Sequence, residues 1–219
     1  VTIPDDAPLS QLYFLQEERD GAMYRWPAGR GNWGLPRDPS PVVGSLSFLP
    51  FQDDEPMGPA VQASAPWRYV GVDRAKGEFE KPVLIVPAVS VAVTPGGVVW
   101  PQGQPEAREV TVALRSEAEE GASGEVTLRA PAGWSVSPAS QPFVLTSAGS
   151  ERTLVFEVQP GSSVTAGEHV FRAIAVVDGQ VYDEGFTLID YEHIERTAVF
   201  ARAEARVTVV PVAVREGLR

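Results

Sequence analysis

Apolar and polar residues alternate along much of the second half of the chain. In "REVTVALRS" (108–116) the valines and the leucine fall on one face, and mainly polar residues fall on the other. A strand with one buried and one solvated face requires this period of two. The same pattern recurs in 124–131, 151–160 and 204–214. Strands of this length, separated by frequent turn signals, predict an immunoglobulin-like β-sandwich over 88–219.

A hairpin is expected within this series at 169–190. Asp178–Gly179 joins its two apolar runs and is a favoured pair for a tight type I′ turn. The fold class predicted for the whole chain is all-β.

The first half of the chain is less regular, and 1–87 is predicted to be a β-rich unit with long loops. The stretch 9–26 could be drawn as a helix, but its aromatic content and the Asp20–Gly21 turn favour two strands. Further strands are expected at 42–51 and 60–70. The sequence therefore indicates two β-sandwich units in tandem.

The boundary between the two units is expected at Pro87–Ala88. The charged, glycine-punctuated stretch from Asp73 to Lys81 predicts a hairpin that completes the first unit. The valines of 89–95 then alternate as in the first strand of a sandwich. Proline cannot donate to a strand ladder and is tolerated where a strand starts, so Pro87 fits this junction.

Charge and composition narrow the classes of partner. The chain has 219 residues with 18 Lys and Arg against 29 Asp and Glu, for a formal net charge of −11. This balance disfavours nucleic acid and anionic membrane surfaces. No apolar run is long enough to predict a membrane span. The first residue is Val1 and no signal region follows it, so we expect a processed protein or an excised fragment. The absence of cysteine excludes disulfides and is compatible with bacterial export.

Candidate chemistry is sparse, and His169 and His193 are the only histidines. His193 lies in "IDYEHIER" (189–196) beside Asp190 and Tyr191, the densest polar cluster of the chain. This cluster could contact a sugar or a metal, or it could be a structural loop corner held by local hydrogen bonds, which we favour. His169 stands at the entry to a strand, where a histidine is unremarkable.

Two acidic stretches, 53–55 and Asp183–Glu184, could be read as calcium sites, but neither has EF-hand spacing. Solvated turns are the better interpretation. Trp33 lies in a glycine-rich loop and is a candidate for stacking on a sugar ring, against packing within the loop. The candidate ligand-binding residues are therefore Trp33, Asp190, Tyr191 and His193, and no catalytic residue, metal site or cofactor is predicted.

Four stretches carry a resemblance to known families. The stretch 128–160, with its order P-x-G-W, S-P and "TLVFEVQP", resembles the NEW3 type of immunoglobulin-like module. The stretches 11–26, 67–91 and 181–195 resemble the non-catalytic middle region of large bacterial PIG-L/LmbE-type deacetylases. The sequence departs from that pattern at Phe14, which stands in place of Trp, and at Gly71, which is an insertion.

The resemblance implies architecture and not catalysis. Members of the family carry a zinc-dependent N-acetyl-sugar deacetylase domain with an A-H-P-D-D-E signature. Here "IPDDAP" (3–8) shares only P-D-D with it. The resemblance therefore implies a non-enzymatic accessory region of a larger secreted bacterial enzyme, extracellular or periplasmic. Upstream sequence would complete its first unit. Its expected partners are the catalytic domain of the same parent chain and glycans.

Two other functions remain open at this point. The first is an adhesion or protein-interaction module that acts through exposed strand edges, for instance around Val207–Val214. The second, which we favour least, is a hydrolase built on Asp190, Tyr191 and His193.

Overall fold

The structure is a computed structural model of the whole chain. It describes residues 3–4, 7–17, 19–26, 34–52, 55–56 and 58–212. The chain divides into two compact units, Val1–Val86 with Thr187–Val199 and Pro87–Phe186 with Phe200–Arg219. It leaves the first unit next to the junction expected at Pro87–Ala88. It also returns to that unit for Thr187–Val199, which the expected division into 1–87 and 88–219 did not include.

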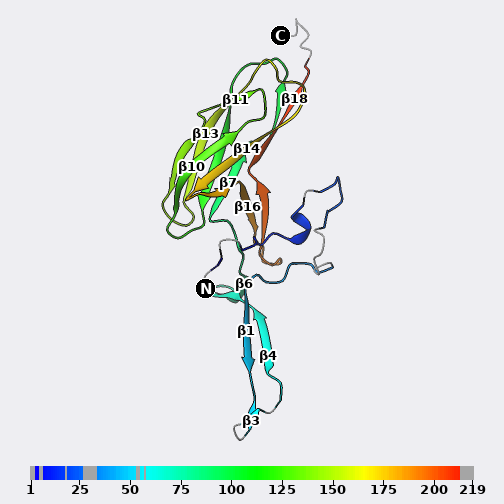
Figure 1. Cartoon of the computed structure of the whole chain (residues 1–219), viewed down its shortest axis with the longest axis vertical. Helices are drawn as coiled ribbons and strands as arrows, with labels where there is room; N and C mark the ends of the chain where they lie inside the picture. Colours follow the sequence, from blue (N-terminus) through cyan, green and yellow to red (C-terminus); the bar gives the residue numbers. More distant parts are fainter. Residues whose placement is uncertain are drawn as a thin grey trace. The chain divides into compact units, whose positions relative to one another are not determined.

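The second unit is a β-sandwich of two sheets (Figure 1). One sheet has the order β12-β10-β14-β18-β8, with β15 paired to β14, and the other has the order β11-β13-β9-β7. All pairings are antiparallel except β18 with β8. The strands are β7 (Val89–Thr94), β8 (Gly97–Pro101), β9 (Arg108–Ser116), β10 (Ala122–Arg129), β11 (Trp134–Ser137), β12 (Gln141–Leu145), β13 (Glu151–Pro160), β14 (Gly167–Val177), β15 (Gln180–Tyr182) and β18 (Glu204–Val210).

The core of the sandwich follows the alternation of the sequence. In β9 the residues Val110, Val112 and Leu114 are buried at 3%, 0% and 1% exposure. The other sheet contributes its own alternate residues, and the largest rings meet edge to face. Trp134 lies 5.0 Å from Trp100, measured between ring centroids. The all-β class and the immunoglobulin-like sandwich are thus confirmed.

The hairpin turn at Asp178–Gly179 also forms as predicted. Asp178 has φ of 49° and Gly179 has φ of 83°, the left-handed pair that a type I′ turn needs. The turn joins β14 to β15 with Val177 opposite Gln180.

The first unit differs from the expected sandwich, because its described strands pair only two by two. β1 (Val43–Phe48) pairs with β4 (Val61–Pro66), and β5 (Arg68–Asp73) pairs with β6 (Gly77–Pro82). The short strands β2 (Phe51–Gln52) and β3 (Glu55–Pro56) form a third pair. Among the described residues, the cluster of buried hydrophobic side chains lies in the second unit, so these hairpins do not form a two-layer core.

The two strands expected within 9–26 do not form among the described residues of this range. Tyr13–Leu15 form the 3₁₀ turn η1, and Asp20 and Met23 form an isolated bridge across a tight turn. The aromatic residues pack locally instead of lining a sheet. Tyr13 is 4% exposed, its N–H donates to Asp38 at 2.7 Å, and the ring of Trp26 lies edge-on at 5.4 Å.

Two further strands each begin in one unit and end in the other. β16 (Glu184–Ile189) and β17 (Thr197–Arg202) pair with each other, and the segment between them belongs to the first unit. Gln11 bridges to Ala198, and the N–H of Ser10 donates to the carbonyl of Ile85 at 2.9 Å. The start of the chain, the end of its first half and the returning segment are therefore held together.

Candidate functional site

The polar cluster expected around His193 lies in the connection between β16 and β17. The N–H of Ile194 donates to the carbonyl of Tyr191 at 3.2 Å, which closes a turn over Glu192 and His193. Asp190, Tyr191 and His193 therefore come together on one exposed loop. Residues 189–196 are called the return loop below.

The return loop is bound to the β5–β6 hairpin by ion pairs. Lys81 Nζ donates to Asp190 Oδ2 at 2.7 Å, and Lys76 pairs with Glu192. The hydrogen bond from Lys81, with the charges of Lys81 and Arg196, holds the pKa of Asp190 below its ordinary value. The hydrogen bond from Lys76 lowers the pKa of Glu192 in the same way. Both carboxylates are therefore charged at neutral pH and serve as counterions.

The turn of the β5–β6 hairpin places these lysines. Asp73 accepts hydrogen bonds from the N–H groups of Ala75 at 2.7 Å and Lys76 at 3.0 Å, and these bonds lower the pKa of Asp73. Gly71 has a packing role on the opposite strand, since a Cβ there would lie 2.5 Å from the ring of Phe79. The residue that departs from the family pattern thus makes room for an aromatic ring beside the return loop.

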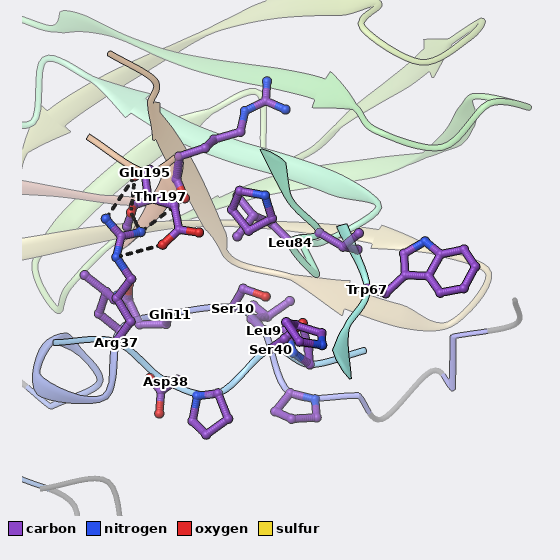
Figure 2. Close-up of a pocket in the computed structure, with 18 of the residues that line it drawn as sticks. Leu9, Ser10, Gln11, Arg37, Asp38, Ser40, Trp67, Leu84, Glu195 and Thr197 are labelled. Carbon is purple, nitrogen blue, oxygen red and sulfur yellow. Dashed lines mark hydrogen bonds and ion pairs between the residues drawn. The ribbon is translucent and has the colours of Figure 1, made fainter. Parts of the chain in front are cut away.

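Glu195 is the centre of a second ionic group. Its Oε1 lies 3.0 Å from Arg68 Nη2 and its Oε2 lies 3.3 Å from Arg37 Nε. Arg37 also donates to Thr197 Oγ1 at 2.8 Å and to the Glu195 carbonyl at 3.1 Å, as Figure 2 shows. Arg68 Nε lies 3.1 Å from Glu80 Oε2, close enough for an ion pair but without hydrogen-bond geometry. The guanidinium of Arg37 is thus already bound within the protein.

Two hollows of the first unit border these ionic groups. The larger, about 910 Å³ and open, is lined by Phe79, Tyr191, His193 and the ion pairs of the return loop. The smaller, about 420 Å³, has mainly apolar walls that include Leu9, Trp67 and several prolines (Figure 2). Of its polar groups, Arg37 and Arg68 are already bound by Glu195, and the others include Ser10, Gln11, Asp38 and Arg196. It therefore suits an apolar group better than an anion.

The return loop does not have the arrangement that a hydrolase needs. A histidine base requires a nucleophile or an orienting acid within hydrogen-bond distance. Among the described residues, the ring of His193 contacts the ring of Tyr191, with centroids 6.1 Å apart, and has no carboxylate partner. Asp190 is instead bound by Lys81 and lies 3.3 Å from Arg196 Nε. The geometry suits a structural tie or a stacking contact.

The other sequence candidates are placed as follows. Trp33, Asp53 and Asp54 lie outside the described residues. His169 Nε2 lies 2.9 Å from the carbonyl of Thr165, and its ring lies 5.7 Å from that of Trp134. No group of three or more histidine and acidic side chains that could hold a metal occurs within the described ranges.

Glu184 has an environment that the sequence did not indicate. Burial, together with the charge of Asp183, raises the pKa of Glu184 above its ordinary value. The raised pKa belongs to an isolated, partly buried carboxyl and not to a cluster of ligands.

The strand edge expected around Val207–Val214 is not an edge. β18 lies between β14 and β8, and Val207–Val209 are paired on both sides and are interior to the sheet, whereas Val210 is paired only with β8. Pro211 and Val212 follow the strand, and residues 213 onward lie outside the described part of the chain. Addition of a strand at Val207–Val209 is therefore excluded, and the edge hypothesis is wrong for these residues.

Sequence analysis missed Arg37, Arg68 and Glu195 as members of one group. Glu195 was part of the quoted "IDYEHIER" stretch, but its partners stand far away in the chain. The only available signal was charge, since the hairpin 68–82 contains four Lys and Arg and the return loop contains three acids, but the hairpin also contains three acids of its own.

Comparisons with known proteins bear on the sandwich. No family model matches the chain, and no curated protein matches it. Within the described residues no helix has the length and apolar character needed to cross a membrane.

Solved structures match part of the chain at low identity. The E. coli chaperone DraB is similar over 57% of this chain and 57% of its own, with 13% identity and a TM-score of 0.34. WR4, a C. elegans MSP family member, covers 55% of this chain and 97% of its own, with 11% identity and a TM-score of 0.30. AggA, the major subunit of aggregative adherence fimbriae type I from Escherichia coli, covers 56% and 94%, with 13% identity and a TM-score of 0.33.

Proposed function

We propose that this chain is a non-catalytic accessory region of a larger secreted bacterial enzyme of the PIG-L/LmbE type, extracellular or periplasmic, in which it positions the catalytic domain. One observation carries the proposal. The two stretches with the most specific family-like pattern, 67–91 and 181–195, are joined by the pairs Lys81–Asp190 and Arg68–Glu195. Residues that resemble the family thus form one ionic framework, as a structural role requires.

The state of the charged groups supports a role without catalysis. Asp190 and Glu192 are each bound by a lysine, and their lowered pKa values keep them ionised at neutral pH. A general acid needs the opposite perturbation, a pKa raised toward the working pH. The return loop is therefore better suited to hold parts of the protein together than to transfer protons.

The test begins with the complete reading frame of the gene. We expect an A-H-P-D-D-E motif in it, and zinc-dependent removal of acetyl groups from N-acetyl sugars by the complete protein. The 219-residue chain alone should show no turnover on the same substrates. A reading frame without that motif would sink the proposal. Turnover by the isolated chain that is lost in His193→Ala would instead favour the hydrolase.

Contact with glycans is the second part of the proposal. Tyr191 is 62% exposed beside His193, and a flat exposed ring can stack on the apolar face of a sugar. Affinity electrophoresis in gels that contain bacterial polysaccharides should retard the chain, and Tyr191→Ala should reduce the retardation. The opposite result is that polysaccharide leaves the mobility of all three proteins unchanged: the chain, Tyr191→Ala and Trp33→Ala. That result would contradict the glycan contact and leave only the positioning role.

A protein-interaction module is the second candidate function. The observation that favours it is the exposed apolar face of the β1–β4 hairpin, where Leu46 is 65% and Phe48 is 51% exposed. On this hypothesis the chain binds another protein and is not part of an enzyme's polypeptide. Absence of any catalytic domain from the reading frame would shift the conclusion to this candidate.

A further inference from the structure

The β1–β4 hairpin has one apolar and one polar face. Its register places Leu46 opposite Ala63 and Phe48 opposite Val61, while Ser45 faces Ser64 and Ser47 faces Gln62. Side chains alternate between the faces of a strand pair, so the apolar residues share one side. We call this side the hairpin face, and its members are Leu46, Phe48, Val61, Ala63 and Ala65.

The hairpin face is open to solvent. Leu46 is 65% exposed, Phe48 is 51% exposed and Val61 is 46% exposed. Every residue of both strands is exposed. Strict alternation is the pattern of a strand packed on one side, and a lone two-stranded hairpin is marginally stable in water. The sequence of this hairpin therefore fits a covered state.

We propose that the hairpin face docks on a second domain of the same polypeptide, on a surface with an apolar centre and a rim of lysine or arginine. This inference rests on the proposed function, since it names the surface through which the accessory region holds its partner domain. The size of the hairpin face and the charge of the chain indicate which partner fits it.

The size of the face favours a tethered partner. Two strands of six residues form a face about 20 Å long and about 10 Å wide, or ~200 Å². A stable complex between separate proteins buries about 800 Å² on each partner. A face of this size by itself gives a weak contact with a separate protein, whereas a domain on the same chain is present at an effective concentration near the millimolar range and can be held by a weak contact.

The charge of the hairpin defines the rim of the partner. Between Val43 and Pro66 the sequence contains Asp53, Asp54 and Glu55 and no Lys or Arg. The whole chain carries a formal net charge of −11. A second copy of this face would bring like charges together, which opposes association, whereas a basic rim would attract it. The complement is thus a different surface and not a second copy.

The experiment uses the absence of native cysteine from the chain. Ala63→Cys places a thiol on the hairpin face, and Ser64→Cys places one next to it on the polar face. Both changes are small, so neither removes a large apolar side chain. Rates of maleimide labelling are measured for both variants in the 219-residue chain and in the complete protein, whose remaining cysteines are replaced.

The two variants should label at similar rates in the 219-residue chain. In the complete protein Ala63→Cys should label about tenfold more slowly or worse, because a contact with a dissociation constant of ~0.1 mM is mostly closed at a millimolar effective concentration. Ser64→Cys should keep its rate. Adding Leu46→Asp, or raising the salt concentration, should restore labelling at position 63, since each weakens the apolar or the ionic part of the contact.

Three results would overturn the inference. The first is equal labelling of Ala63→Cys in the chain and in the complete protein. The second is protection that already appears in the 219-residue chain and rises with its concentration, which would identify a second copy as the occupant. The third is a reading frame that encodes no other domain. Protection by a domain without the A-H-P-D-D-E motif would retain the docking surface and reject the deacetylase parent, so the two proposals fail separately.

Discussion

Replacement of Glu195 by glutamine should release the return loop from the rest of the first unit. Glu195→Gln keeps the size of the side chain and removes the charge that lies between Arg37 and Arg68. The three side chains are 35%, 32% and 33% exposed, so the group lies between a surface pair and a buried pair. Two guanidinium groups would then face each other across a neutral amide.

The free-energy cost of Glu195→Gln can be estimated from the distances of the Glu195 carboxylate, 3.0 Å to Arg68 and 3.3 Å to Arg37. Coulomb's law with an effective dielectric constant of about 20 gives roughly 5 kcal/mol for each pair before solvation is counted. Exposed pairs contribute at most about 1 kcal/mol in measurements, and loss of one partner of a buried pair costs about 3–5 kcal/mol. For side chains one-third exposed, we expect a cost of about 2 kcal/mol in the free energy of local opening.

Amide hydrogen exchange measured by mass spectrometry is the suitable assay, because the chain has two units and a single global transition need not report on one loop. A cost of about 2 kcal/mol corresponds to roughly thirtyfold faster exchange. The faster exchange should appear in 68–82 and 187–199 and not in the sandwich. Glu192→Gln is the matched control, since it also removes one acid of the return loop but breaks only the exposed pair with Lys76.

The reasoning would be refuted if Glu195→Gln exchanged no faster than Glu192→Gln in these two segments. It would also be refuted if Arg37→Met in addition to Glu195→Gln gave the sum of the two single effects, because residues that interact are expected to deviate from additivity.

Two further predictions concern acid and the core. The pair of Asp190 with Lys81 stabilises the loop above the ordinary aspartate pKa of 3.8 and is lost as the pH falls through the lower folded-state pKa. Relative to the intrinsic rate at each pH, exchange in 187–199 should therefore accelerate only in strong acid, and Lys81→Met should reduce this acceleration without abolishing it, because the Lys76–Glu192 and Arg196–Asp190 pairs remain. In the sandwich, Phe156→Ala should cost about 3–5 kcal/mol of unfolding free energy in urea, because Phe156 is 0% exposed. Val155→Ala, at a 44% exposed neighbour on the other face, should change it by less than about 0.5 kcal/mol.

The sandwich could be predicted from the sequence because its strands carry their own pattern. The period of two in β9 and β13 indicates which face of each strand is buried, and a second sheet packed on that face is enough to bury it. The turn at Asp178–Gly179 was predictable for a different reason, since few residue pairs adopt left-handed backbone at both positions. Both signals are local, and local signals are what a single sequence contains.

The first unit could not be predicted to the same extent because its structure depends on distant contacts. The apolar and aromatic residues of 9–26 looked like strands, but Tyr13 is held by Asp38 and Trp26 in a turn. The sequence located Asp190, Tyr191 and His193 in one loop. It gave no means to pair Glu195 with Arg37, because no local pattern encodes an ion pair between residues so far apart.

The sandwich and the β1–β4 hairpin differ in how far their strands are protected from contact with other domains. An exposed edge strand invites pairing with another chain, and proline blocks it because proline cannot donate to a ladder. The strands at the ends of the two sheets are β12, β8, β11 and β7, and each contains a proline or lies within two residues of one: Pro142, Pro101, Pro138, and Pro87 with Pro95. The short strand β15, which pairs only with β14, has none. β1 has no proline within it, and its apolar side chains are exposed. The sandwich thus has a buried core, whereas the hairpin exposes its apolar side chains, and only its second strand, β4, contains a proline, Pro66. Contacts with another domain are therefore expected at the hairpin first.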